Sequence, residues 1–201
     1  MRLLTRQARP MISGVSLVAA AMVLLATAIL PLAAGAAQAE GAKTALPEIR
    51  LVVAEMQVIP AYASPRRAPH ADHRMKSSPQ SVAAAWARAK IRAVGRADRA
   101  RVIILEASVV EVPVTGKSGF LRRGPDRRYD AKLTISVEIR SDAGDLIGNA
   151  QVTARRSQEV LKGVRGDRLQ FVWRDLSERL VDDAARELQR QMQARLGRFL
   201  R

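Results

Sequence analysis

Between residues 129 and 140 the chain reads YDAKLTISVEIR, and its side chains alternate in character at every position. A period of two places the apolar side chains on one face of a strand and the polar side chains on the other. The predicted polar face consists of Lys132, Thr134, Ser136, Glu138 and Arg140. We therefore expect a strand with one face against a hydrophobic core and the other face in water.

Strands are also predicted before and after this segment. Residues 102–112, VIILEASVVEV, are apolar on both faces at their start, which is typical of a central strand. Residues 146–160 follow the polar turn SDAGD and complete an antiparallel meander. Residues 48–59 predict one further strand, with Val52, Ala54, Met56 and Val58 on one face. In the last strand, Gly148, Ala150, Val152 and Ala154 are small enough to let a helix lie close above them.

Two helices complete the predicted fold. Ser78 and Pro79 read as N-cap and first helical residue of a helix that stops at Gly95. A second helix begins at Asp167, with Gln170 in a possible capping box, and runs to about Leu196 with an apolar stripe at steps of three or four. The order βαβββα predicts an α+β domain, a four-stranded, mainly antiparallel sheet with two helices on one face.

The N-terminal segment has the features of a secretory signal peptide. Arginines at positions 2, 6 and 9 precede an apolar run over residues 17–30, and Ala37-Gln38-Ala39 suits signal peptidase. We expect a signal peptide over 1–39, a flexible lead-in over 40–47 and a single α+β domain over 48–201. The protein would then be periplasmic or secreted. The alternative is an uncleaved N-terminal anchor in the inner membrane, since the segment 11–30 that contains this run is just long enough to span a bilayer.

Composition narrows the possible partners. The chain has no cysteine, which excludes disulfides, thiolate metal sites and lipid-modified cysteine. Its net charge of +15 favours anionic partners. Export makes nucleic acid an improbable partner, and aromatic residues, at 3%, are too sparse for a base-stacking surface. The partners that remain possible are an acidic protein surface and an anionic lipid.

The connection over residues 113–128, PVTGKSGFLRRGPDRR, is the predicted binding segment. It is long, basic and apolar at its centre, and long loops are often functional or disordered. One interpretation is a disordered loop whose Phe120 folds back onto the domain. The other is insertion at a membrane surface or into a partner, with cations pairing to phosphates or carboxylates. The binding residues under the second interpretation are Lys117, Phe120, Leu121, Arg122, Arg123, Arg127 and Arg128. The basic C-terminus, residues 195–201, could overhang the sheet and take part.

Motifs for catalysis and for cofactors are missing from the sequence. There is no H-E-x-x-H, no G-x-S-x-G and no Gly-rich phosphate loop. His70 and His73, the only histidines, lie among prolines with no third ligand at a motif spacing, so we expect a solvated loop and no metal site. Asp182 and Asp183 sit among arginines on the polar face of the last helix. We expect a non-catalytic protein without a cofactor.

The order of elements on an exported chain resembles the small envelope lipoproteins of Gram-negative bacteria. Examples are the LPS-assembly lipoprotein that plugs the outer-membrane translocon and the auxiliary lipoproteins of lipid-transport ABC systems. The segments WARAKIRAVG, VIILEASVVEVP and RYDAKLTISVEI also look like an uncharacterised group of proteobacterial exported proteins. This chain departs from the lipoproteins because it has no lipobox cysteine. The resemblance implies an envelope protein that binds a protein partner in assembly or transport, or alternatively binds anionic lipid or LPS through residues 113–128 and the basic C-terminus.

Overall fold

The structure is a computed structural model that describes residues 47–114 and 124–201. All of these residues belong to one compact unit, Lys43–Arg201. The predicted signal peptide over 1–39 lies outside the described residues, as does almost all of the predicted lead-in.

The main sheet has four strands in the order β2-β4-β5-β6. The strands are β2 (Glu55–Pro60), β4 (Arg99–Pro113), β5 (Pro125–Arg140) and β6 (Leu146–Leu161). β2 runs parallel to β4, and the other two pairings are antiparallel. The predicted α+β fold class, with its mainly antiparallel sheet, is confirmed.

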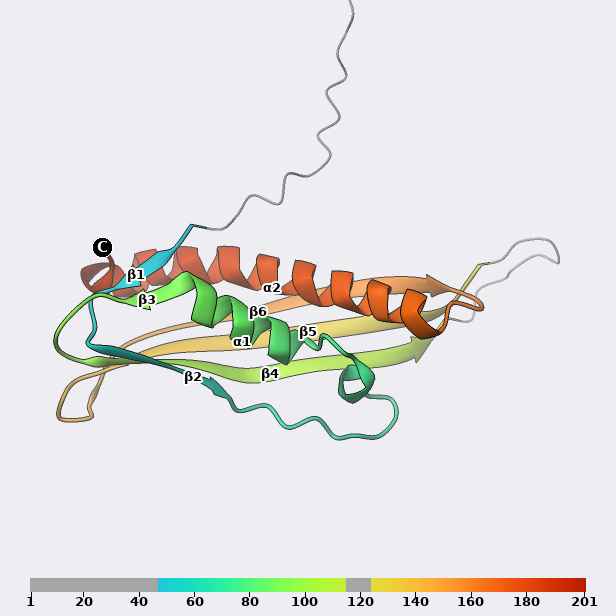
Figure 1. The fold of residues 1–201 in the computed structure, drawn as a ribbon, viewed down its shortest axis with the longest axis horizontal. Coiled ribbons are helices and arrows are strands. Elements are labelled where there is room, and N and C mark those ends of the chain that lie inside the picture. The colour runs from blue at the N-terminus through green and yellow to red at the C-terminus, as the bar shows by residue number, and fades with distance from the viewer. Residues whose placement is uncertain (1–46, 115–123) are drawn as a thin grey trace, which may run out of the picture. The chain divides into compact units, whose positions relative to one another are not determined.

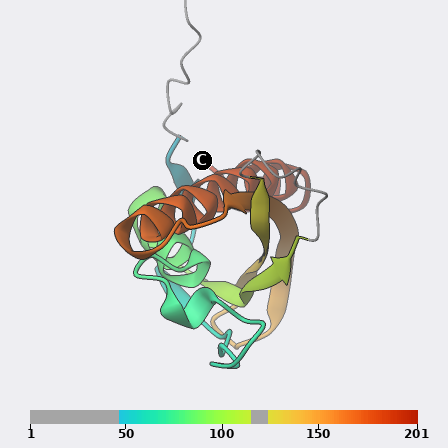
Figure 2. The same cartoon turned by 90° about the vertical axis from the view of Figure 1, so that its right-hand side faces the viewer.

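Two helices lie on the same face of this sheet (Figures 1 and 2). α1 (Pro79–Lys90) connects the parallel strands β2 and β4, and the long α2 (Gly166–Leu196) follows β6 and packs mainly on β6 and β5. Figure 2 shows the sheet curling around the helices, so the helices occupy its concave side. The short 3-10 helices η1 (Asp72–Arg74) and η2 (Gly197–Phe199) complete the described elements.

The core forms between the inward face of β5 and the apolar stripe of α2. The inward side chains of β5 are buried, and so are those of the α2 stripe; they comprise Tyr129, Leu133, Ile135, Val137 and Ile139 with Trp173, Leu176, Leu180, Leu188, Met192 and Leu196. The Tyr129 and Trp173 rings meet edge to face, with centroids 5.5 Å apart. Burying each large apolar side chain stabilises the fold by about 1.5–3 kcal/mol. The period-two and helical patterns of the sequence are thereby confirmed.

The small residues of β6 allow the end of α2 to approach the strand closely. A methyl group added at Gly148 would lie 2.6 Å from Leu196 Cδ2 and 3.2 Å from Phe199 Cε2. Ala150 and Val152 are buried beneath the same helix. The prediction that small side chains on this strand make room for a helix is confirmed.

The predicted strand over residues 48–59 is wrong as a single element. It is divided into β1 (Ile49–Leu51), which pairs with β3 (Ile91–Ala93) in a small parallel sheet, and β2 in the main sheet. The division changes the buried face, because Val53 is fully buried whereas Val52 is 40% exposed.

The C-terminal boundary predicted for the first helix is also wrong. Ser78 caps α1 as predicted, accepting a 3.3 Å hydrogen bond from the Ser81 amide. The helix ends at Lys90, and β-branched Ile91 enters β3 instead. Gly95 therefore does not end the helix, and its amide donates to the Val53 carbonyl oxygen at 2.8 Å.

Three expectations about polar and terminal segments require correction. α2 has no capping box, because Asp167 pairs with Lys76 at 3.4 Å and Gln170 bonds the backbone of Arg74 and Lys76. Thr134 and Ser136, expected in water, are buried between neighbouring strands, where Thr134 bonds Thr153 at 3.0 Å.

The basic C-terminus does not overhang the sheet. Phe199 is buried, Leu200 bridges to Leu51, and the Arg201 amide donates to the Arg50 carbonyl oxygen at 3.1 Å. The guanidinium of Arg198 donates to the Ile147 carbonyl oxygen at 2.8 Å. The last residues therefore tie β1 to the end of α2, and the guanidinium of Arg198 is engaged in holding the fold.

Substitution of Gly95 by alanine tests the packing of this junction. The new methyl group would lie 2.5 Å from the Val52 carbonyl carbon and 2.6 Å from the Val53 amide nitrogen, so backbone must move. We expect Gly95→Ala to lower the free energy of unfolding by about 1–3 kcal/mol in urea denaturation. Gly197→Ala is the matched control, because Gly197 has helical dihedral angles and nothing within 4 Å of an added methyl group. Equal stability of the two variants would contradict this packing.

Candidate functional site

The segment between β2 and α1 follows the edge of β4 beyond the end of β2. The amides of Ala61 and Tyr62 donate to the Ile104 carbonyl oxygen at 3.0 Å. Further along, the Ala71 amide donates to Val109 at 2.8 Å, and the Glu111 amide donates to Pro69 at 2.8 Å. The segment is therefore held to the sheet by backbone hydrogen bonds, contrary to the solvated loop expected from its prolines.

Asp72 anchors this segment from the inside. Its side chain is almost fully buried, and Oδ1 accepts a hydrogen bond from the Val109 amide at 3.4 Å. The hydroxyl of Tyr62 donates to Oδ2 at 3.5 Å, and His70 Nδ1 lies 3.7 Å from Oδ1. Burial, together with the charge of Asp72, raises the pKa of Tyr62 to about 12. A buried carboxylate needs such partners, because an isolated buried charge is costly.

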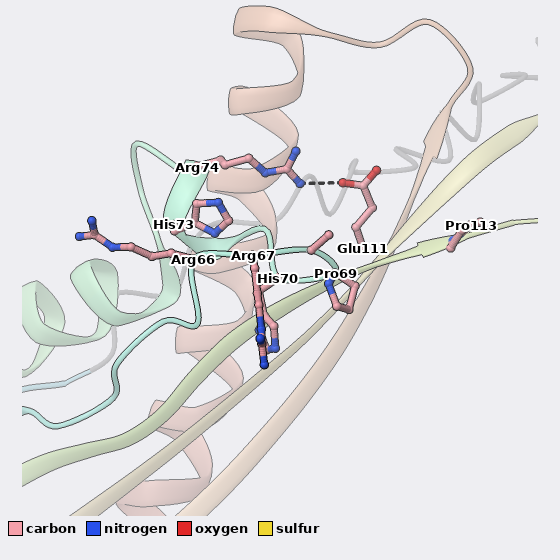
Figure 3. A pocket seen from close by; sticks show the side chains of 9 residues that line it. Arg66, Arg67, Pro69, His70, His73, Arg74, Glu111 and Pro113 are labelled. Carbon is pink, nitrogen blue, oxygen red and sulfur yellow. Dashed lines mark hydrogen bonds and ion pairs between the residues drawn. The ribbon is translucent and has the colours of Figure 1, made fainter.

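A pocket opens where this segment meets the end of β4 (Figure 3). Its volume is about 570 Å³. It is lined by Arg66, Arg67, Ala68, Pro69, His70, His73, Arg74, Glu111 and Pro113. In Figure 3, Arg67 and His70 extend in the same direction from the segment, while Arg74 reaches across to Glu111. We call this the cationic pocket.

The charges of the cationic pocket are unbalanced. Its single acid, Glu111, is 2.7 Å from Arg74 Nη2 and 3.9 Å from Arg127 Nη1. One carboxylate is thus shared between two guanidinium groups. Arg66 and Arg67 form no ion pair within residues 47–114 and 124–201. A positive φ of 49° at Arg66, sparsely populated for a residue with a side chain, places this pair at a tight turn. The pocket is suited to hold an anion.

The residues predicted to bind a partner are only partly described. Lys117, Phe120, Leu121, Arg122 and Arg123 lie outside the described residues. The connection is shorter than predicted, because β5 begins at Pro125 and takes in Arg127 and Arg128. Pro113, where the connection leaves β4, lines the cationic pocket.

Arg127 and Arg128 are strand residues that are engaged within the fold. Arg127 donates to the Val164 carbonyl oxygen at 2.8 Å, and Arg128 binds both oxygens of Asp130 at 2.8 and 2.9 Å. Arg127 nevertheless contributes to the charge near the cationic pocket through Glu111.

Sequence reasoning missed the contribution of residues 66–74 to this site. His70 and His73 line the pocket, and Asp72 between them is buried as the anchor. The signal available was the spacing Arg66-Arg67, His70, His73-Arg74, which concentrates cations in a segment with a single acid. Within the part of the chain that the structure covers, no group of three or more His, Asp and Glu side chains could hold a metal ion. No helix in that part is long and apolar enough to cross a membrane.

Comparisons with known proteins give partial likenesses. No protein-family model matches the chain, and no curated protein matches it. A minor lipoprotein from Acinetobacter baumannii is 15% identical, with a TM-score of 0.39, over 69% of this chain and 92% of its own. A protein described as a lipoprotein from Caulobacter crescentus is 11% identical, with a TM-score of 0.40, over 69% of this chain and 88% of its own.

The rare lipoprotein B from Shewanella oneidensis is 12% identical, with a TM-score of 0.35, over 70% of this chain and 95% of its own. The present chain contains no cysteine that a lipid could modify. At these identities and TM-scores no residue role passes from the three proteins to this chain.

Titration of the tyrosines tests the anchor at Asp72. The chain has only Tyr62 and Tyr129, and burial raises the pKa of both. The unfolded chain loses these protons near pH ~10. The stability that comes from keeping Tyr62 protonated is therefore present below pH ~10 and is lost as pH rises toward about 12.

We expect phenolate absorbance of the folded protein to appear well above pH ~10, and Tyr62→Phe to remove one of the two delayed transitions. Appearance of both phenolates near the unfolded pKa would contradict the described burial.

Proposed function

We propose that the protein is an exported, non-catalytic envelope protein that uses the cationic pocket to bind an anionic group of a protein partner. The observation that carries the proposal is the pocket's charge, with Arg66 and Arg67 unpaired while Glu111 is shared by Arg74 and Arg127. Guanidinium groups bind carboxylate and phosphate through two parallel hydrogen bonds, which gives affinity together with orientation. Export is supported by the leader-like features of residues 1–39.

Binding is favoured over catalysis by the composition of the pocket lining. Among the residues that the structure describes, the pocket lining includes no serine, threonine, cysteine or lysine that could act as a nucleophile. His70 is the one lining residue next to a buried acid, but its Nδ1 is 3.7 Å from Asp72, beyond hydrogen-bond distance. Glu111 is held between arginines, which suits a fixed counter-charge better than a general base.

The geometry of the pocket sets what the partner must present. A single carboxylate or phosphate would meet Arg66 or Arg67 without displacing the Arg74–Glu111 pair, whose atoms are 2.7 Å apart. The volume of about 570 Å³ has room for the anionic group and the residues that carry it. The pocket opens beside Pro113, the last residue of β4.

Replacing the two unpaired arginines tests this function. We expect Arg66→Ser together with Arg67→Ser to abolish co-purification of the partner from an envelope extract, while the fold is retained because neither side chain forms a described ion pair. Arg96→Ser together with Arg101→Ser is the matched control, since it removes the same charge from exposed positions at the other end of β4.

A partner lost equally from both double variants would show that net charge suffices and would refute a role for the pocket. Retention of the partner by both double variants would also refute a role for the pocket.

Direct binding of anionic lipid is the second candidate. It is favoured by the phosphate-binding chemistry of Arg66 and Arg67 and by Phe120 and Leu121 in the neighbouring connection. Flotation with vesicles of phosphatidylglycerol or of phosphatidylcholine separates the two candidates. A lipid-binding protein floats only with the anionic vesicles, and Arg66→Ser with Arg67→Ser reduces its flotation. A protein that captures its partner but floats with neither vesicle excludes the lipid candidate.

A further inference from the structure

β6 forms a long outer edge of the main sheet. It pairs with β5 on one side, and no described strand pairs with its other side. Every second residue of an edge strand directs its N–H and C=O groups away from the sheet, ready to pair with another strand. β6 spans 16 residues, whereas β2 at the opposite edge spans 6. The edge of β6 is therefore the larger exposed template.

The exposure of the β6 side chains shows which of them would lie beside the side chains of a docked strand. From Ala150 to Glu159 the odd-numbered residues are exposed on the convex face, and the even-numbered residues are covered to varying degrees by α2. Proteins blunt such edges with charged residues, and β6 carries Arg155, Arg156 and Glu159 near its C-terminal end. The arrangement of these charges decides what can pair here.

Two charges on the convex face, Arg155 and Glu159, form no close ion pair in the described part of the chain, although Glu159 lies opposite Arg128 in the sheet and attracts it electrostatically. Their neighbours are engaged, because Asp130 binds Arg128 and Ser157 while Lys132 binds Glu106 at 2.6 Å. In the sheet Arg155 lies directly opposite Lys132, a like charge. Like charges opposite each other are destabilising, so an acid on the outer side of Arg155 would relieve this contact.

The charges around Ser157 are complementary to those of a second β6 strand that runs antiparallel to the first. In an antiparallel pair of two β6 strands centred on Ser157, Arg155 of each copy lies opposite Glu159 of the other. Arg156, which is held by Asp183 at 3.3 Å, then lies opposite Gln158. A centre at Thr153 or Arg155 loses these matches, and a centre at Arg155 places arginine against arginine. A register that differs by one residue would put opposing side chains on different faces.

We propose that β6 is the interface at which a second copy of this chain docks, antiparallel and centred on Ser157. The pairing joins two main sheets into one continuous sheet with both helical layers on the same side, which is an isologous two-fold arrangement. The overlap extends from Thr153 to Leu161 in each copy. Small specific interfaces are typical of weak, transient association, so we expect a dimer that forms and dissociates with protein concentration. The proposal does not use the cationic pocket.

Charge reversal tests the register. We expect the protein expressed from its full chain to show a concentration-dependent monomer–dimer equilibrium in sedimentation velocity. Glu159→Arg, or Arg155→Glu, places like charges opposite each other twice in the pair, and each variant alone should dimerise at least about tenfold more weakly. Both residues are exposed, and circular dichroism is the check that the variants fold.

Mixing the two variants provides the decisive measurement. A chain with Arg155→Glu carries two acids, a chain with Glu159→Arg carries two bases, and each residue then meets an opposite charge across the pair. The mixture should recover dimer that neither variant forms alone, and the double variant Arg155→Glu with Glu159→Arg should dimerise as the natural chain does. A natural chain that stays monomeric at several hundred micromolar, a dimer insensitive to both reversals, or a mixture no tighter than its components would each overturn the proposal.

Discussion

The close contact between α2 and β6 is the constraint on which the remaining architecture depends. Gly148 leaves no room for a side chain between the strand and Leu196, and Ala150 and Val152 continue this small-residue surface. Because the helix lies on the strand here, Phe199 and Leu200 reach β1, and the Val52 amide donates to the Phe199 carbonyl oxygen at 2.8 Å. The C-terminal residues thereby hold β1 in place. β3 then pairs with β1 and sets where α1 ends.

Local periodicity was sufficient to predict the main sheet and the long helix. The alternation over residues 129–140 and the stripe on α2 each reflect a single face packed against one core. Such patterns can be recognised from the sequence alone. β1 and β3 were missed because each is only three residues long and its stability comes from tertiary pairing. A Gly95 that reads as a helix end is used instead for close approach of two backbones. Thr134 and Ser136 look exposed by pattern, but long neighbouring strands cover them.

The cationic pocket was less predictable because it depends on where an irregular segment packs. The basic character of residues 66–76 is visible in the sequence, but their attachment to β4 depends on Asp72 accepting the Val109 amide. A single buried carboxylate produces no periodic pattern in the sequence, so it cannot be predicted in this way. The apolar alternation begins at Tyr129 and so predicts that Arg127 and Arg128 belong to the loop, whereas they extend β5 and bind Val164 and Asp130. Cation content thus directs attention to residues 113–128, which begin at the pocket residue Pro113, but it does not show which side chains remain unpaired.

Ion pairs neutralise part of the positive charge of the described residues, so the setting of an unpaired arginine matters more than its lack of a partner. On α2, Arg179 pairs with Asp175 and Arg186 pairs with Asp183, and near the C-terminus Arg198 donates to the Ile147 carbonyl oxygen. Arg66 and Arg67 are left unpaired in a concave setting, where an anion can be surrounded instead of met at a flat surface. The central claim is that this pocket holds an anionic group.

The most direct test is an NMR titration of the protein with glycerol phosphate. The account predicts amide shift changes that saturate and are confined to residues 66–74 and 109–113. Saturating shift changes centred on other residues would contradict the account. Shift changes no larger than those that chloride produces at equal ionic strength would also contradict it.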